Sequence, residues 1–89
     1  MHHLQRPEWY TSSISKVQGE KSAAALKKGL EIMESTSAPE PVVFIHEDMC
    51  EFKWSNSVIY VFGDERKTIC IQHNGHEFVE SCLSELTFT

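Results

Sequence analysis

The sequence predicts an α+β fold, in which one N-terminal amphipathic helix packs on one face of a four- to five-stranded antiparallel meander. Residues 14–35 space their apolar side chains three and four apart, as a helix does, whereas residues 42–79 contain five short β-type segments. The connectors between these segments are all short, and such connectors permit only antiparallel neighbours, because a parallel crossover needs about a dozen residues. The 89 residues are therefore expected to form a single domain.

The helix is expected over residues 14–35, with its most regular part at 20–34. Its apolar stripe consists of Ile14, Val17, Ala23, Leu26, Leu30 and Met33. Gly19 and Gly29 each weaken a helix by about 1 kcal/mol relative to alanine, and Gly19 could separate a short leading turn from the rest. The segment STSAPEP ends the helix, because proline disfavours helical angles at the residue before it.

The two ends of the chain carry less pattern. Residues 1–13 are expected to be irregular, with the aromatic pair Trp9 and Tyr10 packing back onto the domain. Residues 80–89, ESCLSELTFT, fit a short helix or a last strand equally well.

The sheet is expected over residues 42–79. Its strands are VVFI (42–45), CEFKW (50–54), VIYVF (58–62), KTICIQH (67–73) and HEFV (76–79), joined by HEDM, SNS, GDER and NG. Loops of three, four and two residues for SNS, GDER and NG set a register that places eight apolar residues on one face. These are Phe52, Trp54, Val58, Tyr60, Phe62, Ile69, Ile71 and Phe78. We expect the helix to cover this face, with Trp54 and Tyr60 largely buried at its centre.

The opposite face of the sheet is the candidate partner-binding surface. In the same register it carries the apolar residues Ile59, Val61 and Val79 with the acidic residues Glu51 and Glu77 beside them. One helix covers only one face, and monomers seldom expose a large apolar patch, so this face is expected to bind a protein partner or a second copy. Val61→Arg should then leave the fold intact. The alternative is that residues 80–89 fold across part of the face.

Charge indicates the kind of partner. The net charge is −5, and residues 36–89 hold three Lys/Arg against nine Asp/Glu, a balance of −6. Direct nucleic-acid binding is not expected, since it depends on Lys and Arg that displace counterions from phosphates. We therefore expect a protein partner with a basic surface, which would complement the acidic half of the chain.

The chain offers no strong catalytic or metal-binding motif. His73 and His76 flank an Asn-Gly turn and could be neighbours across a hairpin, but Zn²⁺ needs three or four protein ligands and no third falls on their face. Three cysteines at spacings of 20 and 12 residues form no disulfide framework, which favours reduced thiols in a cytoplasmic protein. There is no apolar run that could cross a bilayer and no signal-peptide core at the start. We therefore expect a non-enzymatic protein with no cofactor, no bound metal and no membrane association.

The plan of the chain bears a resemblance to known proteins. An N-terminal aromatic pair, one helix and the stretch APEPVVFIHEDMCEFKWSNS, within residues 9–80, resemble small uncharacterised proteins of bacteria and their phages. The size, acidity and helix-plus-meander plan are also similar to those of the small inhibitors that phages use against bacterial defence, including anti-CRISPR proteins. Those inhibitors share no common motif, so the resemblance assigns no residue. It implies an inhibitor that blocks a larger host complex, which could be a complex that binds nucleic acid.

Two other functions remain open from the sequence. The first is an antitoxin or immunity-type protein that neutralises one cognate enzyme. The second is a small metal-binding protein, which would depend on the pair His73 and His76.

Overall fold

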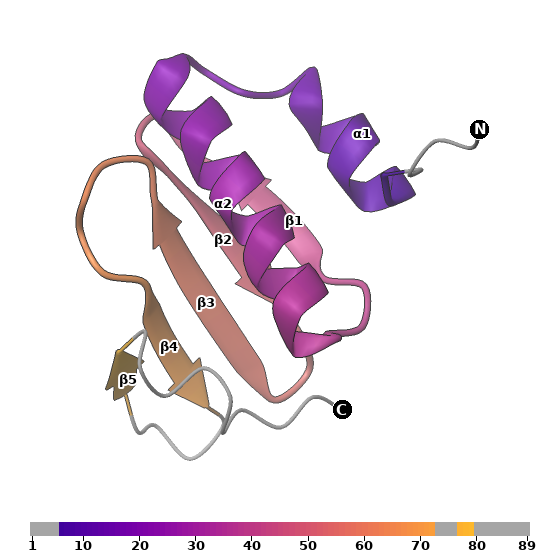
Figure 1. Cartoon of the computed structure of the whole chain (residues 1–89), viewed down its shortest axis with the longest axis vertical. Helices are drawn as coiled ribbons and strands as arrows, with labels where there is room; N and C mark the ends of the chain where they lie inside the picture. Colours follow the sequence, from indigo (N-terminus) through magenta and orange to yellow (C-terminus); the bar gives the residue numbers. More distant parts are fainter. Residues whose placement is uncertain (1–5, 73–76, 80–89) are drawn as a thin grey trace.

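The computed structural model describes residues 6–72 and 77–79. Two N-terminal helices lie on one face of a five-stranded antiparallel sheet (Figure 1). The helices are α1 (Glu8–Ile14) and α2 (Glu20–Thr36), and the strands are β1 (Val42–Ile45), β2 (Met49–Lys53), β3 (Ser57–Phe62), β4 (Ile69–Gln72) and β5 (Glu77–Val79). The strand order is β1-β2-β3-β4-β5, so the expected α+β class with a meander is confirmed. None of the helices described is long and apolar enough to span a membrane.

The helical region differs from the expectation in having two helices instead of one. Residues 8–13 are helical, not irregular, and the long helix begins at Glu20, not at residue 14. Gly19 separates the two with a φ of 149°, which L-residues with a side chain rarely adopt. The expected packing of the aromatic pair is confirmed, because Tyr10 is buried and the ring of Trp9 meets that of Phe52 edge-on at 5.8 Å between centroids.

The turn between β2 and β3 is one residue shorter than expected. The N–H of Trp54 donates to the carbonyl of Ser57 at 2.8 Å, so only Ser55 and Asn56 lie in the loop. Two-residue hairpin loops are the commonest because their twist matches that of the strands. Phe52 consequently pairs with Ile59, not with Tyr60. A slip of one residue turns every side chain of a strand to the other face, and the predicted faces of β2 and β3 were wrong relative to each other.

Of the other two predicted registers, one is confirmed and one is wrong. The predicted GDER register is confirmed, with Val58 opposite Ile71 and Tyr60 opposite Ile69. Between β4 and β5, Ile71 pairs with Glu77 and not with Phe78 as expected.

The core lies between α2 and the face of the sheet that carries the odd-numbered residues of β3. Its members with at most 1% of their surface exposed are Ala25, Leu26, Cys50, Phe52, Ile59, Val61 and Cys70. Phe52 lies on the helix-covered face as predicted, together with Ile59 and Val61. The prediction that Trp54 and Tyr60 are largely buried at the centre of this face was wrong, because both are only half-buried and Tyr60 lies on the other face. Trp54 is half-buried and its indole N–H donates to the carbonyl of Pro39 at 2.9 Å.

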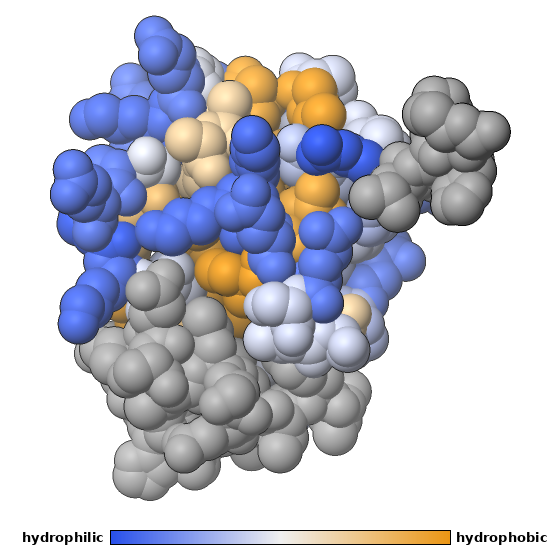
Figure 2. Space-filling model, viewed as in Figure 1, coloured by the Kyte–Doolittle hydropathy of each residue, from blue (hydrophilic) through white to orange (hydrophobic). Residues whose placement is uncertain are grey.

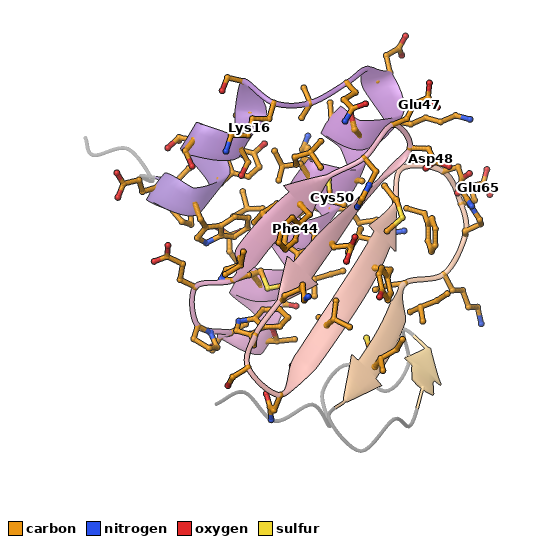
Figure 3. The ribbon with its side chains drawn as sticks, turned by 180° about the vertical axis from the view of Figure 1, so that it is seen from behind. Lys16, Phe44, Glu47, Asp48, Cys50 and Glu65 are labelled. Atoms are coloured by element: carbon orange, nitrogen blue, oxygen red, sulfur yellow. The ribbon has the colours of Figure 1, made fainter. Side chains whose placement is uncertain are left out.

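The other face of the sheet, which we call the open face, is covered by neither α1 nor α2 (Figures 1 and 3). The strand pairings place ten described side chains on it in adjacent rows. They are Val42, Phe44, Met49, Glu51, Lys53, Val58, Tyr60, Phe62, Ile69 and Ile71. Eight of these ten are apolar or aromatic, so both faces of this sheet are apolar.

Candidate functional site

Two of the five residues predicted to bind a partner cannot lie on an exposed surface. Ile59 and Val61 are each 0% exposed beneath the helices. The prediction that they face away from the helix was wrong, because it rested on a three-residue loop between β2 and β3. Val61→Arg would accordingly place a charge inside the core instead of on the outside.

Of the remaining three predicted residues, the structure describes the side chain of Glu51 and only the backbones of Glu77 and Val79. Glu51 lies on the open face opposite Phe44, and in β5 the backbones of Glu77 and Val79 pair with Ile71 and Ile69. The described side chains do not include those of Glu77 and Val79. Glu51 therefore keeps its predicted position, beside a different set of apolar neighbours.

The apolar part of the open face is larger than the cluster predicted from the sequence. Val58, Tyr60 and Phe62 of β3 stand beside Ile71 and Ile69 of β4, and all five side chains are half-buried. Nothing among the described helices shields them, in contrast to the helix side, where hydrophilic side chains spread over α2 (Figure 2). Apolar surface of this kind in water is typical of an interaction site.

Two of the three exposed large apolar residues in the described part of the chain lie on the edge strand β1. Val42 is 60% exposed and Phe44 is 46% exposed, and the Phe44 side chain stands on the open face in Figure 3. A pocket of about 530 Å³ lies beside them and is lined by Pro39, Glu40, Val42, Phe44, Lys53, Trp54 and Ser55. The ammonium of Lys53 lies 5.6 Å from the centre of the Phe44 ring, within range of a cation–π contact. This pocket could accept an apolar side chain of a partner.

Charged side chains frame the opposite end of the open face. Arg66 donates to Asp48 at 2.8 Å and to Asp64 at 2.9 Å, and its guanidinium lies 4.2 Å from the centre of the Phe62 ring. The side-chain and backbone hydrogen bonds from Arg66 lower the pKa of Asp64 to about 2. His46 Nε2 lies 2.6 Å from Glu51 Oε1. Asp64 is therefore ionised at neutral pH, next to the aromatic end of the face.

The described cysteines have no features of a catalytic site. Cys50 and Cys70 are fully buried, and desolvation raises the pKa of Cys50 to about 12. A nucleophilic cysteine needs a stabilised thiolate, and burial here favours the neutral thiol. Cys50 Sγ donates to the carbonyl of Ser22 at 3.5 Å, which is a packing contact between β2 and α2.

The described residues contain no group of three or more His, Cys, Asp or Glu side chains that could hold a metal ion. His73 and His76, the pair considered in the sequence, lie outside the described residues, as does Cys82. The metal-binding alternative thus stays a prediction about that turn.

Sequence reasoning missed β1 as a candidate. VVFI was treated only as a strand of the sheet, although it contains no charged residue, no proline and no glycine. Edge strands usually carry one of these features, which discourage pairing with other chains. Its position at the start of a meander was a usable signal, because the first strand of a meander is an edge strand.

Comparisons with known proteins add no assignment. No family model, no curated protein and no solved structure matches this chain.

Proposed function

We propose that this chain is a non-enzymatic protein-binding module that acts as an inhibitor, using the open face to occupy a site on a larger host complex. The observation that carries the proposal is the open face itself. It presents Val58, Tyr60 and Phe62 beside two isoleucines, while both helices lie on the other side of the sheet. Burying such a face against a partner removes apolar area from water at about 25 cal/mol per Å².

Charge supports a basic site on the partner. The half of the chain that builds the sheet, residues 36–89, has a balance of −6. Carboxylates around an apolar face steer association and disfavour wrong partners more than they add affinity. The resemblance to phage inhibitors extends the proposal to a protein encoded by a phage or another mobile element. The complex that such an inhibitor blocks could itself bind nucleic acid, whose phosphates a basic site accepts.

The test is a pull-down from the native host with tagged protein, followed by mass spectrometry. Val58→Arg places a charge at the middle of the open face, and Ala24→Arg makes a comparable change on the exposed side of α2. Both variants are first checked for folding by circular dichroism. The proposal expects a partner that is retained by Ala24→Arg and lost by Val58→Arg.

The opposite result would contradict the proposal. A partner that is retained by Val58→Arg and lost by Ala24→Arg would place the binding surface on the helix side. If the partner is one enzyme that the protein neutralises, the antitoxin or immunity-type alternative is supported instead of the inhibitor of a larger complex.

A further inference from the structure

The outer edge of β1 has free backbone hydrogen-bonding groups. The N–H of His46 donates to the carbonyl of Met49, so His46, Phe44 and Val42 direct their backbone groups toward β2. In an antiparallel strand the alternate residues point the other way, which places the backbone groups of Val43 and Ile45 at the outer edge. The carbonyl of Ile45 accepts from the Gln18 side chain at 3.2 Å. The described part of the chain gives the N–H groups of Val43 and Ile45 no acceptor.

We propose that a partner binds by strand addition: an extended segment with basic residues at its ends pairs with the outer edge of β1. This inference rests on the proposed function and names the partner's chemistry. In such pairing, main-chain hydrogen bonds supply affinity and side-chain pockets supply specificity. Helix α1 lies alongside the same edge in the helix layer (Figure 1). The pocket lined by Val42 and Phe44 lies on the open face, on which Figure 3 labels Phe44.

The pocket fits the alternate side chains of an added strand. Side chains on one side of that strand would continue the row of the open face past Val42 and Phe44. There they would meet the pocket of about 530 Å³, whose walls include Pro39 and Trp54. Medium-sized apolar side chains such as valine or isoleucine suit both the pocket and an extended backbone.

Two carboxylates determine the preferred occupant. Glu40 precedes β1 and Glu47 follows it; both are exposed, and neither has an ion pair among the described residues. They bracket an uncharged strand, VVFI. A segment with an apolar middle and a Lys or Arg near each end is therefore complementary to the edge.

The same charges argue against the two other candidate occupants. If two copies paired antiparallel through β1, with Val43 opposite Ile45, Glu40 of each copy would lie beside Glu47 and Asp48 of the other. The C-terminal residues 80–89 carry two glutamates and no Lys or Arg, so Glu40 and Glu47 repel this segment as well. Like charges directly opposite each other destabilise a strand pair.

The test uses the full chain and two synthetic peptides, acetyl-RTVTVTR-amide and acetyl-ETVTVTE-amide. Binding is followed by NMR, through amide shifts and through hydrogen exchange at Val43 and Ile45. We expect the basic peptide to slow exchange at both amides and to bind about tenfold more tightly than the acidic peptide, a ratio that corresponds to about 1.4 kcal/mol. Glu40→Lys with Glu47→Lys should reverse this preference.

Two variants of Val43 separate edge pairing from side-chain contact. Val43→Pro removes the outward N–H, which the sheet itself does not use, and proline is tolerated on edge strands. Val43→Ala shortens the same side chain and keeps the N–H. Strand addition predicts that Val43→Pro weakens peptide binding by about tenfold or more, while Val43→Ala binds like the wild type. Equal loss in both variants would overturn the proposal.

Other outcomes are equally decisive. Absence of binding by the basic peptide at millimolar concentration, or a stable dimer of the chain alone in light scattering, would overturn the proposed occupant. A native partner that is lost by Val58→Arg and kept by Val43→Pro would leave the proposed function standing and refute strand addition.

Discussion

The ring of Phe52 lies directly against the backbone of Gly29, with no room between them for a side chain on residue 29. Gly29 is in the middle of α2, and Phe52 is fully buried in β2. The glycine thus lets the helix approach the sheet closely at its most buried aromatic residue. The helix loses about 1 kcal/mol of intrinsic propensity at this position relative to alanine.

We expect Gly29→Ala to destabilise the protein by about 1–3 kcal/mol, because the cost of overpacking exceeds the gain in helix propensity. Urea unfolding measures the change. Phe52→Leu in the Gly29→Ala background should recover part of the loss, so the two substitutions should be non-additive by about 0.5 kcal/mol or more. A Gly29→Ala variant more stable than the wild type would show that Phe52 does not pack there.

Arginine substitutions in β3 test which face meets the helices. Val61→Arg should unfold the protein, because a buried unpaired charge costs more than about 4 kcal/mol. Val58→Arg, three positions earlier on the open face, should leave the circular dichroism spectrum unchanged. The reverse pattern would restore the register with a three-residue loop. The comparison is matched, since both positions replace valine in the same strand.

Thr68 is fully buried, and its hydroxyl has no hydrogen-bond partner among the described residues. A buried hydroxyl without a partner costs about 1–3 kcal/mol of desolvation. Thr68→Val keeps the shape and removes the hydroxyl, and we expect it to raise the unfolding free energy by about 1 kcal/mol. Thr68→Ser, which keeps the hydroxyl and removes the methyl group, should lower it. Thermal melts of the two variants provide the measurement, and a destabilised Thr68→Val would indicate a partner for the hydroxyl.

We expect the burial of Cys50 to make the free energy of unfolding depend on pH in the alkaline range. Its pKa rises from an ordinary value of 9.0 to about 12 in the folded protein, through burial. Between these values the folded state keeps a proton that the unfolded state releases. The contribution of Cys50 is therefore complete below pH 9, and it decreases as the pH approaches 12. Urea midpoints at pH 8, 9 and 10 should fall less in Cys50→Ala than in the wild type, and parallel curves would contradict the assignment.

The elements of this fold were largely predictable from the sequence, whereas their faces were not. The strand pattern and short connectors were sufficient for the meander, and the GDER loop length gave the correct pairing of Tyr60 with Ile69. The choice between two and three residues at SNS could not be made in the same way. Usually the polar face of a strand decides the register, but Val58, Tyr60 and Phe62 alternate with the equally apolar Ile59 and Val61.

An uncovered apolar face of the sheet was predictable from the sequence, but the residues on it were not. The prediction of one helix against a sheet with two apolar faces indicated that one face is left uncovered, and neither of the two observed helices covers it. Its composition followed from the register, so Ile59 and Val61 were assigned to the wrong side. Gly29 was interpreted only as a weak point in the helix, because a single sequence does not tell which ring will lie against a given glycine.

The two apolar faces of β3 also bear on how this chain reaches its native state. The β2–β3 hairpin can form with Ser55 and Asn56 in its loop or with one additional loop residue. Both hairpins bring apolar side chains of β3 toward a helix, so hydrophobic collapse early in folding favours neither strongly. Close packing selects the native hairpin only later, when Phe52 must fit against Gly29. We expect refolding to show a slow phase as misregistered hairpins reopen, a kinetic cost of an open face that is as apolar as the core.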